Sequence, residues 1–131
     1  MSDFTMLNLM DDVPDSMLEH APGEIEGRFT RTPTGTRDFG VSRFTYAPNV
    51  RSPSGHHHRE QEEAYLVIAG SGRVLIDDEP HTLRQWDVVR VGPSVVRAFE
   101  AGPDGLDLVA VGGPKPEGGD GVLAESPWPA D

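Results

Sequence analysis

Residues 55–63 gather more metal-ligating side chains than any other stretch of the sequence. They read GHHHREQEE, with histidines at 56, 57 and 58 and glutamates at 60, 62 and 63. If the histidines lie on a β-strand, His56 and His58 point to one face and His57 to the other, because side chains alternate along a strand. Two imidazoles and a carboxylate form a ligand set for Fe, Mn, Zn or Ni. The spacing therefore predicts a divalent metal site.

The position of the carboxylate ligand depends on where the strand ends. A straight strand from His56 would place Glu62 on the histidine face, but the charged run 59–62 is typical of a bend, after which the alternation starts again. Glu63 opens the next apolar run, and Tyr65 shares its face. We therefore expect Glu63 to be the ligand, with Glu62 as the alternative, and Tyr65 to offer its hydroxyl to the same pocket.

The rest of the chain has the pattern of an all-β protein. Short apolar runs recur about every 8–12 residues and are separated by Gly- and Pro-containing turns, which is typical of a sandwich or barrel. A short helix is expected over residues 14–19. The predicted strands cover residues 27–32, 40–47, 56–58, 63–69, 73–77, 81–83, 87–91, 96–100 and 106–111.

The chain of 131 residues has the length of one domain. Changes in composition divide it into an acidic N-terminal arm (1–23), a β-barrel domain (24–112) and a Gly/Pro-rich C-terminal tail (113–131). In that tail, Trp128 is the residue that could pin the segment to the barrel.

The composition argues against several classes of partner and site. There are 22 Asp and Glu against 11 Lys and Arg, so the net charge of −11 disfavours binding to nucleic acid. No cysteine is present, which excludes disulfides, zinc–thiolate sites and a cysteine nucleophile. No apolar run approaches the ~20 residues of a membrane span, and the N-terminus lacks the basic region of a secretory signal. We therefore expect a cytoplasmic protein with neither membrane nor nucleic-acid partners.

Several predicted strands are apolar on both faces. This holds for residues 66–68, 88–89 and 109–111. In a barrel one face lines the interior, so the other face needs a neighbouring segment or a second subunit to cover it. We therefore expect a homodimer.

The histidine-rich stretch resembles the first motif of the cupin superfamily: His, any residue, His, three or four residues, Glu, six residues, Gly. His56, His58, Glu63 and Gly70 occupy every fixed position of that core. The resemblance covers roughly residues 40–112. It implies a double-stranded β-helix, also called a jelly-roll or cupin-type barrel, with a small-molecule pocket at its mouth.

Residues 86–97 resemble the second cupin motif, with three departures. Trp86 replaces the first glycine, Ser94 replaces the turn glycine, and Arg97 stands where the family has a fourth metal-binding histidine. An arginine is permanently charged and cannot be a ligand. Two alternatives follow. In the first, three ligands hold a metal with open positions, and Arg97 binds an anionic group of a substrate beside it. In the second, Arg97 pairs with Glu63 or Glu62 and replaces the metal.

Three functions are compatible with these residues. The first is a metal-dependent cupin in which His56, His58 and Glu63 bind the metal, and in which Arg97 and Tyr65 orient a small polar substrate. The second is a metal-free cupin that binds or senses a small ligand through Arg97. The third is a structural or regulatory dimer with a vestigial pocket. The sequence does not decide whether the protein is an enzyme, because this fold supports many unrelated activities.

Overall fold

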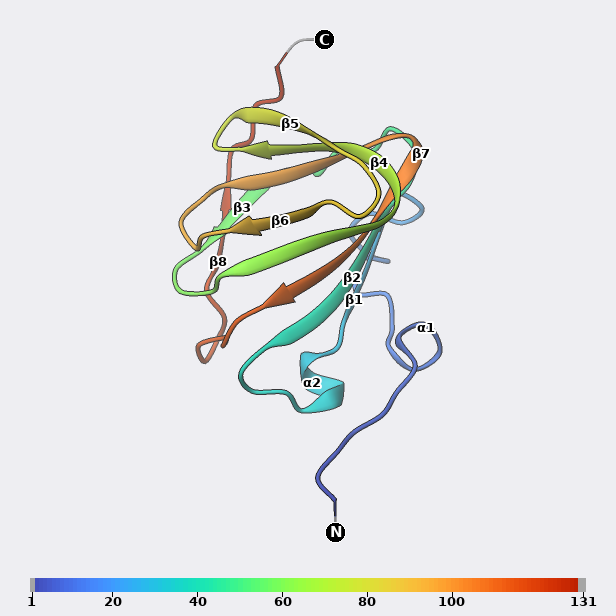
Figure 1. Ribbon diagram of the computed structural model, residues 1–131, viewed down its shortest axis with the longest axis vertical. Helices are drawn as coiled ribbons and strands as arrows, with labels where there is room; N and C mark the ends of the chain where they lie inside the picture. Colours follow the sequence, from blue (N-terminus) through green and yellow to red (C-terminus); the bar gives the residue numbers. More distant parts are fainter. Residues whose placement is uncertain (1, 130–131) are drawn as a thin grey trace.

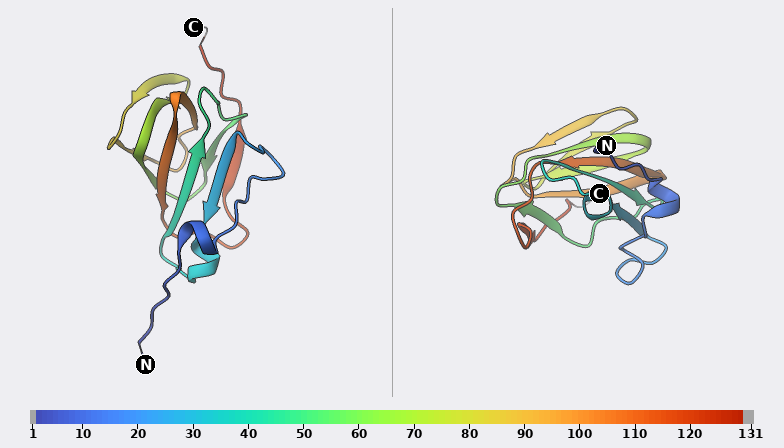
Figure 2. Two further views of the ribbon diagram at one scale, coloured as in Figure 1. Left: turned by 90° about the vertical axis from the view of Figure 1, so that its right-hand side faces the viewer. Right: turned by 90° about the horizontal axis from the view of Figure 1, so that it is seen from below.

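The chain folds into a curled antiparallel sheet, as the computed structural model of residues 2–129 shows (Figure 1). This is the all-β, double-stranded β-helix architecture expected from the sequence. Two short helices, α1 (Leu9–Asp12) and α2 (Arg31–Thr34), lie near one end of the sheet (Figures 1 and 2). The strands are β1 (Ile25–Phe29), β2 (Gly40–Tyr46), β3 (Gly55–His58), β4 (Glu63–Ile76), β5 (Glu79–Leu83), β6 (Val88–Val91), β7 (Arg97–Gly112) and β8 (Gly121–Ala124).

Two long strands, β4 and β7, pass through both halves of the barrel. The first part of β4 pairs with β6 and with the end of β7, and its last part pairs with β5 and with the start of β7. Beyond β7, the sheet continues to β2 and β1 on one side and to β3 and β8 on the other. The sequence predicted two shorter strands in place of each long one. This was wrong, because the glycine-containing segments bend the strands and leave irregularities in the ladder without ending them.

Gly70 shows why the bend in β4 needs a residue without a side chain. Its φ is +75°, and a Cβ atom at this position would lie 2.0 Å from the carbonyl oxygen of Gly105 on β7. Any other residue would therefore force the two strands apart. The glycine that closes the first cupin-like motif thus has a packing reason in this chain.

Trp86 occupies a turn whose backbone also suits glycine. Its φ is +76°, which is unfavourable for a bulky side chain, and the indole is 66% exposed. The turn persists because the Trp86 amide donates to the carbonyl of Val67 at 2.7 Å. The departure from glycine in the second cupin-like motif therefore keeps the local backbone shape at the cost of strain.

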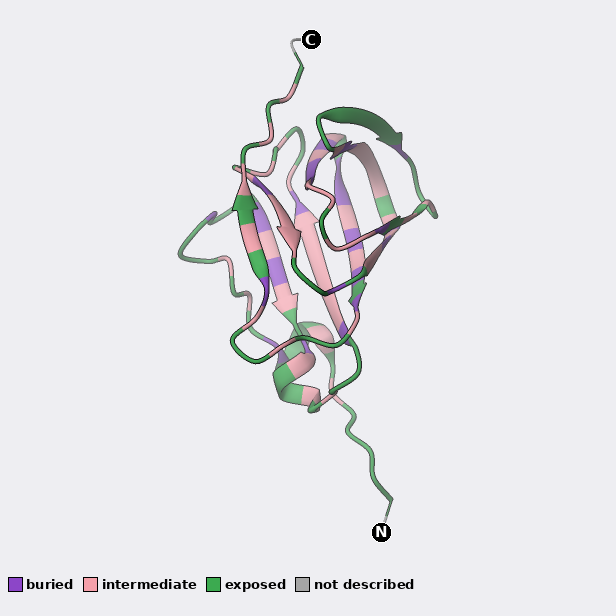
Figure 3. Cartoon of the chain, turned by 90° about the vertical axis from the view of Figure 1, so that its left-hand side faces the viewer, coloured by how far each residue is buried: buried purple, intermediate pink, exposed green. Residues whose placement is uncertain are grey.

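The core lies inside the curl of the sheet, where buried residues alternate with more exposed ones along the strands (Figure 3). On the outer face, Val88 remains 66% exposed and Val111 43% exposed. The strands that were apolar on both faces thus keep apolar side chains exposed, and the homodimer stays a prediction. Tyr65, Val67, Val74, Phe99, Leu106 and Leu108 are among the buried core residues.

Both terminal segments contact the barrel, the N-terminal one through Asp15, whose Oδ1 accepts from the Gly27 amide of β1 at 3.0 Å. The helix expected over residues 14–19 was wrong, because residues 16–20 form turns, and the helix of this region is α1. In the C-terminal segment, β8 pairs with β3, and the centre of the Trp128 ring lies 5.2 Å from the guanidinium of Arg51 and 5.3 Å from that of Arg73.

Within residues 2–129, no helix has both the length and the apolar character that a membrane crossing requires.

Candidate metal centre

Strand β3 presents two histidines to the same side. It pairs with β8 through His56 and Leu123 and through His58 and Gly121, so its backbone is fixed along its length. Because side chains alternate along the strand, His56 and His58 project together, with ring centroids 5.2 Å apart, whereas His57 lies outside the cluster. The arrangement follows from the His-X-His spacing and the regular pairing of β3.

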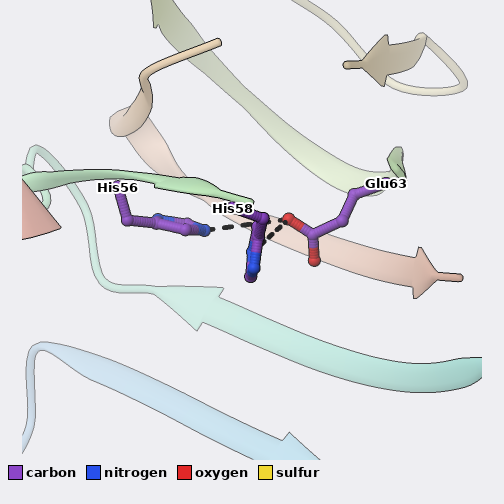
Figure 4. Close-up of side chains that lie close together, drawn as sticks. All are labelled: His56, His58 and Glu63. Carbon is purple, nitrogen blue, oxygen red and sulfur yellow. Dashed lines mark ion pairs between the residues drawn. The ribbon is translucent and has the colours of Figure 1, made fainter. Parts of the chain in front are cut away.

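Glu63, the first residue of β4, brings its carboxylate to the two histidines (Figure 4). Its Oε1 lies 3.1 Å from Nε2 of His58 and 3.7 Å from Nε2 of His56. The candidate ligand atoms of the three residues all lie within 4.8 Å of one another. Glu62 instead is exposed and pairs with Arg90, whose Nε lies 2.5 Å from its Oε2. Glu63, and not Glu62, therefore supplies the carboxylate of the cluster.

The donor atoms of this cluster fit a divalent metal ion. Nε2 of His58 is buried and has no hydrogen-bond partner among residues 2–129, and only 13% of the side chain is exposed. A buried nitrogen of this kind is costly unless something binds its lone pair. Two imidazole nitrogens and one hard oxygen suit Fe, Mn, Zn or Ni, and three protein ligands leave positions for water or substrate.

The Glu63 carboxylate is held in its ionised form. Burial opposes ionisation, but the contacts with His56, Tyr65 and His58 and the charge of Arg97 together lower the pKa of Glu63. The Tyr65 hydroxyl donates a hydrogen bond of 2.7 Å to Oε1. Burial and the Glu63 charge raise the pKa of Tyr65 well above its usual value, so it remains a donor. Tyr65 thus contacts the candidate ligand itself.

Arg97 lies beside the cluster and is fully buried, with 0% of its surface exposed. Its Nη1 donates to the carbonyl of His56 at 3.4 Å and its Nη2 to the carbonyl of Gly92 at 3.2 Å. Nη2 lies 3.9 Å from Oε1 of Glu63, and Nε has no hydrogen-bond partner in the part of the chain that the structure describes. Backbone carbonyls therefore hold the guanidinium, and its contact with Glu63 is a long one, not a bidentate pair.

Asp120 is a site residue that the sequence analysis did not identify. Its carboxylate accepts from the amides of Glu60 (2.7 Å) and Gln61 (2.9 Å) and from Nε2 of Gln61 (2.7 Å), and Oδ1 lies 2.9 Å from Nδ1 of His58. Burial opposes its charge, but these contacts with Gln61, Glu60 and His58 hold the pKa of Asp120 well below its usual range. An ionised Asp120 needs a proton on Nδ1, which leaves Nε2 of His58 free to face Glu63. No local spacing links Asp120 to the histidines, so no sequence signal pointed to it.

The cluster opens onto a cavity of about 380 Å³. His58 and Glu63 line it, and so do Phe29 and Phe44, whose rings meet edge to face. Arg31 of α2 also reaches this cavity. Two of the candidate ligands, His58 and Glu63, are therefore accessible to a small molecule in this cavity.

Comparison with known proteins agrees with the fold described above. Residues 42–111 match the family model of the cupin domain, and no curated protein sequence gives a significant match. An uncharacterised protein from Klebsiella pneumoniae with a double-stranded β-helix domain is 20% identical; the match covers 95% of this chain and 100% of that one, with a TM-score of 0.73. A cupin protein from Bacteroides fragilis is 18% identical, with 89% of each chain covered and a TM-score of 0.71.

A polyketide cyclase from Streptomyces resistomycificus is 21% identical; the match covers 86% of this chain and 80% of the cyclase, with a TM-score of 0.69. At these identities the likeness establishes the fold and not the activity. With the family match spanning both cupin-like motifs and the barrel formed as they imply, the chain belongs to the cupin domain family.

Proposed function

We propose that the protein binds a divalent transition metal through His56, His58 and Glu63 and acts on a small polar molecule in the adjoining cavity. The observation that carries the proposal is the convergence of three ligand atoms within 4.8 Å of one another, with two of the three residues, His58 and Glu63, lining that cavity. A bound Fe, Mn, Zn or Ni ion would supply Lewis-acid or oxygen-activating chemistry there. A metal-dependent enzyme is the function that this combination of ligands and cavity supports best.

The chain's own residues have separate tasks in this proposal. His56 and His58 would each offer an imidazole nitrogen to the metal, and Asp120 orients the His58 ring so that its Nε2 faces the cluster. Tyr65 fixes the rotamer of Glu63 through its hydrogen bond. Arg97 supplies a buried positive charge beside the ligands, which favours an anionic or strongly polar group of the substrate at this place.

Elemental analysis of untagged protein, purified without a nickel column and without chelator, tests the proposal. We expect close to one equivalent of Fe, Mn, Zn or Ni. His58→Ala should lose the metal, and His57→Ala should retain it because His57 lies outside the cluster. Equal metal loss in the two variants, or no metal after incubation of the wild type with each ion, would contradict it.

One observation favours a second candidate, a metal-free cupin that binds a small ligand. Arg97 places a permanent cation 3.9 Å from Glu63, so the site already holds a positive charge that could take the place of a metal ion. In that case the protein would bind no metal, and a small anion would raise its melting temperature. Arg97→Met would abolish that rise, and His58→Ala would leave most of it.

A further inference from the structure

Two cations lie at the mouth of the cavity in an otherwise acidic protein. Arg31 and Lys115 both line it, and Lys115 is the only lysine in a chain with a net charge of −11. The hydrogen bonds of Arg31 go to the carbonyl of Gly113 (2.7 Å), the Oε1 of Gln61 (3.4 Å) and the carbonyl of Arg37 (3.4 Å). All three acceptors are uncharged, so the charge of Arg31 has no carboxylate partner in the described part of the chain.

The acidic residues that line the same cavity are already engaged. Asp120 accepts from the Glu60 and Gln61 amides, the Gln61 side chain and His58, and Glu63 faces Tyr65 and the histidines. Both carboxylates stay ionised, so the lining holds two negative charges and two positive ones. Such a balanced lining is far less negative than a chain with a net charge of −11, and Arg31 and Lys115 are its cations for a small anion.

The backbone around Arg31 is shaped to hold its side chain over the cavity. Gly40 and Gly112 are register partners on β2 and β7. A Cβ atom at Gly40 would lie 2.8–3.0 Å from the Arg31 guanidinium, and one at Gly112 would lie 3.0 Å from Oε1 of Gln61. The absence of side chains at both positions leaves the room that Arg31 and Gln61 occupy.

Arg31 is also connected to the candidate metal centre. It donates to Gln61, Gln61 donates to Asp120, and Asp120 contacts Nδ1 of His58. A group bound at Arg31 therefore lies at one end of a continuous hydrogen-bonded chain whose other end is a ligand of the cluster. This places Arg31 and the cluster in one site, and Lys115 lines the same cavity.

We infer that the molecule taken by this cavity carries a carboxylate or phosphate group, which Arg31 and Lys115 bind at the mouth. The inference rests on the proposed function, because the rest of the molecule would extend toward His56, His58 and Glu63. The guanidinium suits this task because its parallel N–H groups match the oxygens of either anion, and Lys115 adds a mobile point charge. The Phe29–Phe44 pair offers an apolar wall for the part between the two ends.

Calorimetric titration of the full-length protein with inorganic phosphate, with malonate and with neutral glycerol tests the inference. Each titration is run after dialysis against EDTA and again after addition of Mn²⁺. We expect phosphate, malonate or both to bind and glycerol not to bind, with an affinity that falls as NaCl is added. The stronger of the two anions identifies the group that the site prefers.

Variants connect that binding to the two cations. Arg31→Gln should weaken it about tenfold and Lys115→Gln severalfold, because each loses a charge-assisted contact. Arg31→Lys keeps the charge and should recover part of the loss. Arg84→Gln removes the same charge from an exposed position away from the cavity and should bind as the wild type does. Circular dichroism of Arg31→Gln checks that its contacts with Gly113 and Gln61 are not needed for folding.

Three outcomes would overturn the inference: no binding of either anion at millimolar concentration, equal weakening in Arg31→Gln and Arg84→Gln, or binding that needs Mn²⁺ and is unchanged in Arg31→Gln. The metal content of Arg31→Gln separates this inference from the metal proposal, since the variant should keep its metal. Anion binding by a protein that takes up no metal would refute the metal site alone. Metal uptake without anion binding would refute the anion site alone.

Discussion

The carboxylate of Asp120 lies 2.9 Å from Nδ1 of His58, although 62 positions separate the two residues in the chain. The contact exists because β8, which begins one residue after Asp120, pairs with β3, which carries His58. Asp120 also accepts hydrogen bonds from the backbone of Glu60 and Gln61 and so closes the turn between β3 and β4. The C-terminal segment thereby orients one candidate ligand and fixes the path of the chain to the next.

Asp120→Asn should weaken metal binding about 10- to 100-fold, because the variant no longer fixes the tautomer of His58. Equilibrium dialysis with Zn²⁺ or Mn²⁺ measures the change. Asp104→Asn serves as the control, since Asp104 is exposed and lies outside the cavity. Wild-type affinity in Asp120→Asn would show that the contact with His58 has no influence on the site.

Tyr65→Phe should weaken metal binding about fivefold, the amount that corresponds to roughly 1 kcal/mol for one lost hydrogen bond to Glu63. Tyr46→Phe provides a matched control, because Tyr46 is also buried but its hydroxyl bonds Ser52. The same dialysis assay applies to both. If the two variants lose metal to the same extent, the effect comes from core packing and not from Glu63.

Arg97→His should strengthen metal binding by on the order of tenfold or more, since it removes a cation near the ligands and adds a fourth imidazole. Arg97→Met removes the charge without adding a ligand and should give a smaller gain. Metal titration of both variants, with melting curves to verify folding, separates the two contributions. Unchanged affinity in both would mean that the buried guanidinium does not act on the site.

Trp86→Gly should be about 1 kcal/mol more stable than Trp86→Ala, because only glycine adopts a φ of +76° without steric cost. The two variants lose the same exposed indole, so their difference isolates the backbone strain. Urea denaturation measures it. A glycine variant no more stable than the alanine variant would show that the turn relaxes around the larger residue.

Glu100 provides a pH-dependent contribution to stability at a distance from the cluster. Burial opposes its charge, but Arg51 and Arg73 hold the pKa of Glu100 below its ordinary value. A carboxylate with a lowered pKa stabilises the fold above the pKa of the unfolded chain, about 4.3, and loses this contribution as the pH falls through the folded value. Glu100→Gln should therefore cost about 1 kcal/mol at pH 7 and progressively less below pH 4.

Urea denaturation of wild type and Glu100→Gln across that pH range, with the exposed Glu79→Gln as control, tests the dependence. A difference as large at pH 3 as at pH 7 would assign the loss to packing and not to charge.

Local spacing along the chain was sufficient for the part of the site that lies on adjacent strands. The alternation of a β-strand places His56 and His58 on one face whatever the rest of the fold does, and the restart of alternation after the charged run singled out Glu63. The same short-range reasoning predicted an all-β domain. It failed where glycines bend β4 and β7 without ending them, because a bend and a turn use the same residue types.

Only the tertiary structure decided which distant residues join that cluster. The sequence contains Asp120 and Arg31 but gives no reason to connect either of them with His58. Asp120 reaches His58 through the pairing of β8 with β3, and Arg31 reaches the cavity because Gly40 leaves room for its side chain. Such contacts depend on how strands close into a barrel, which is set by packing over the whole chain and not by the spacing of neighbouring residues.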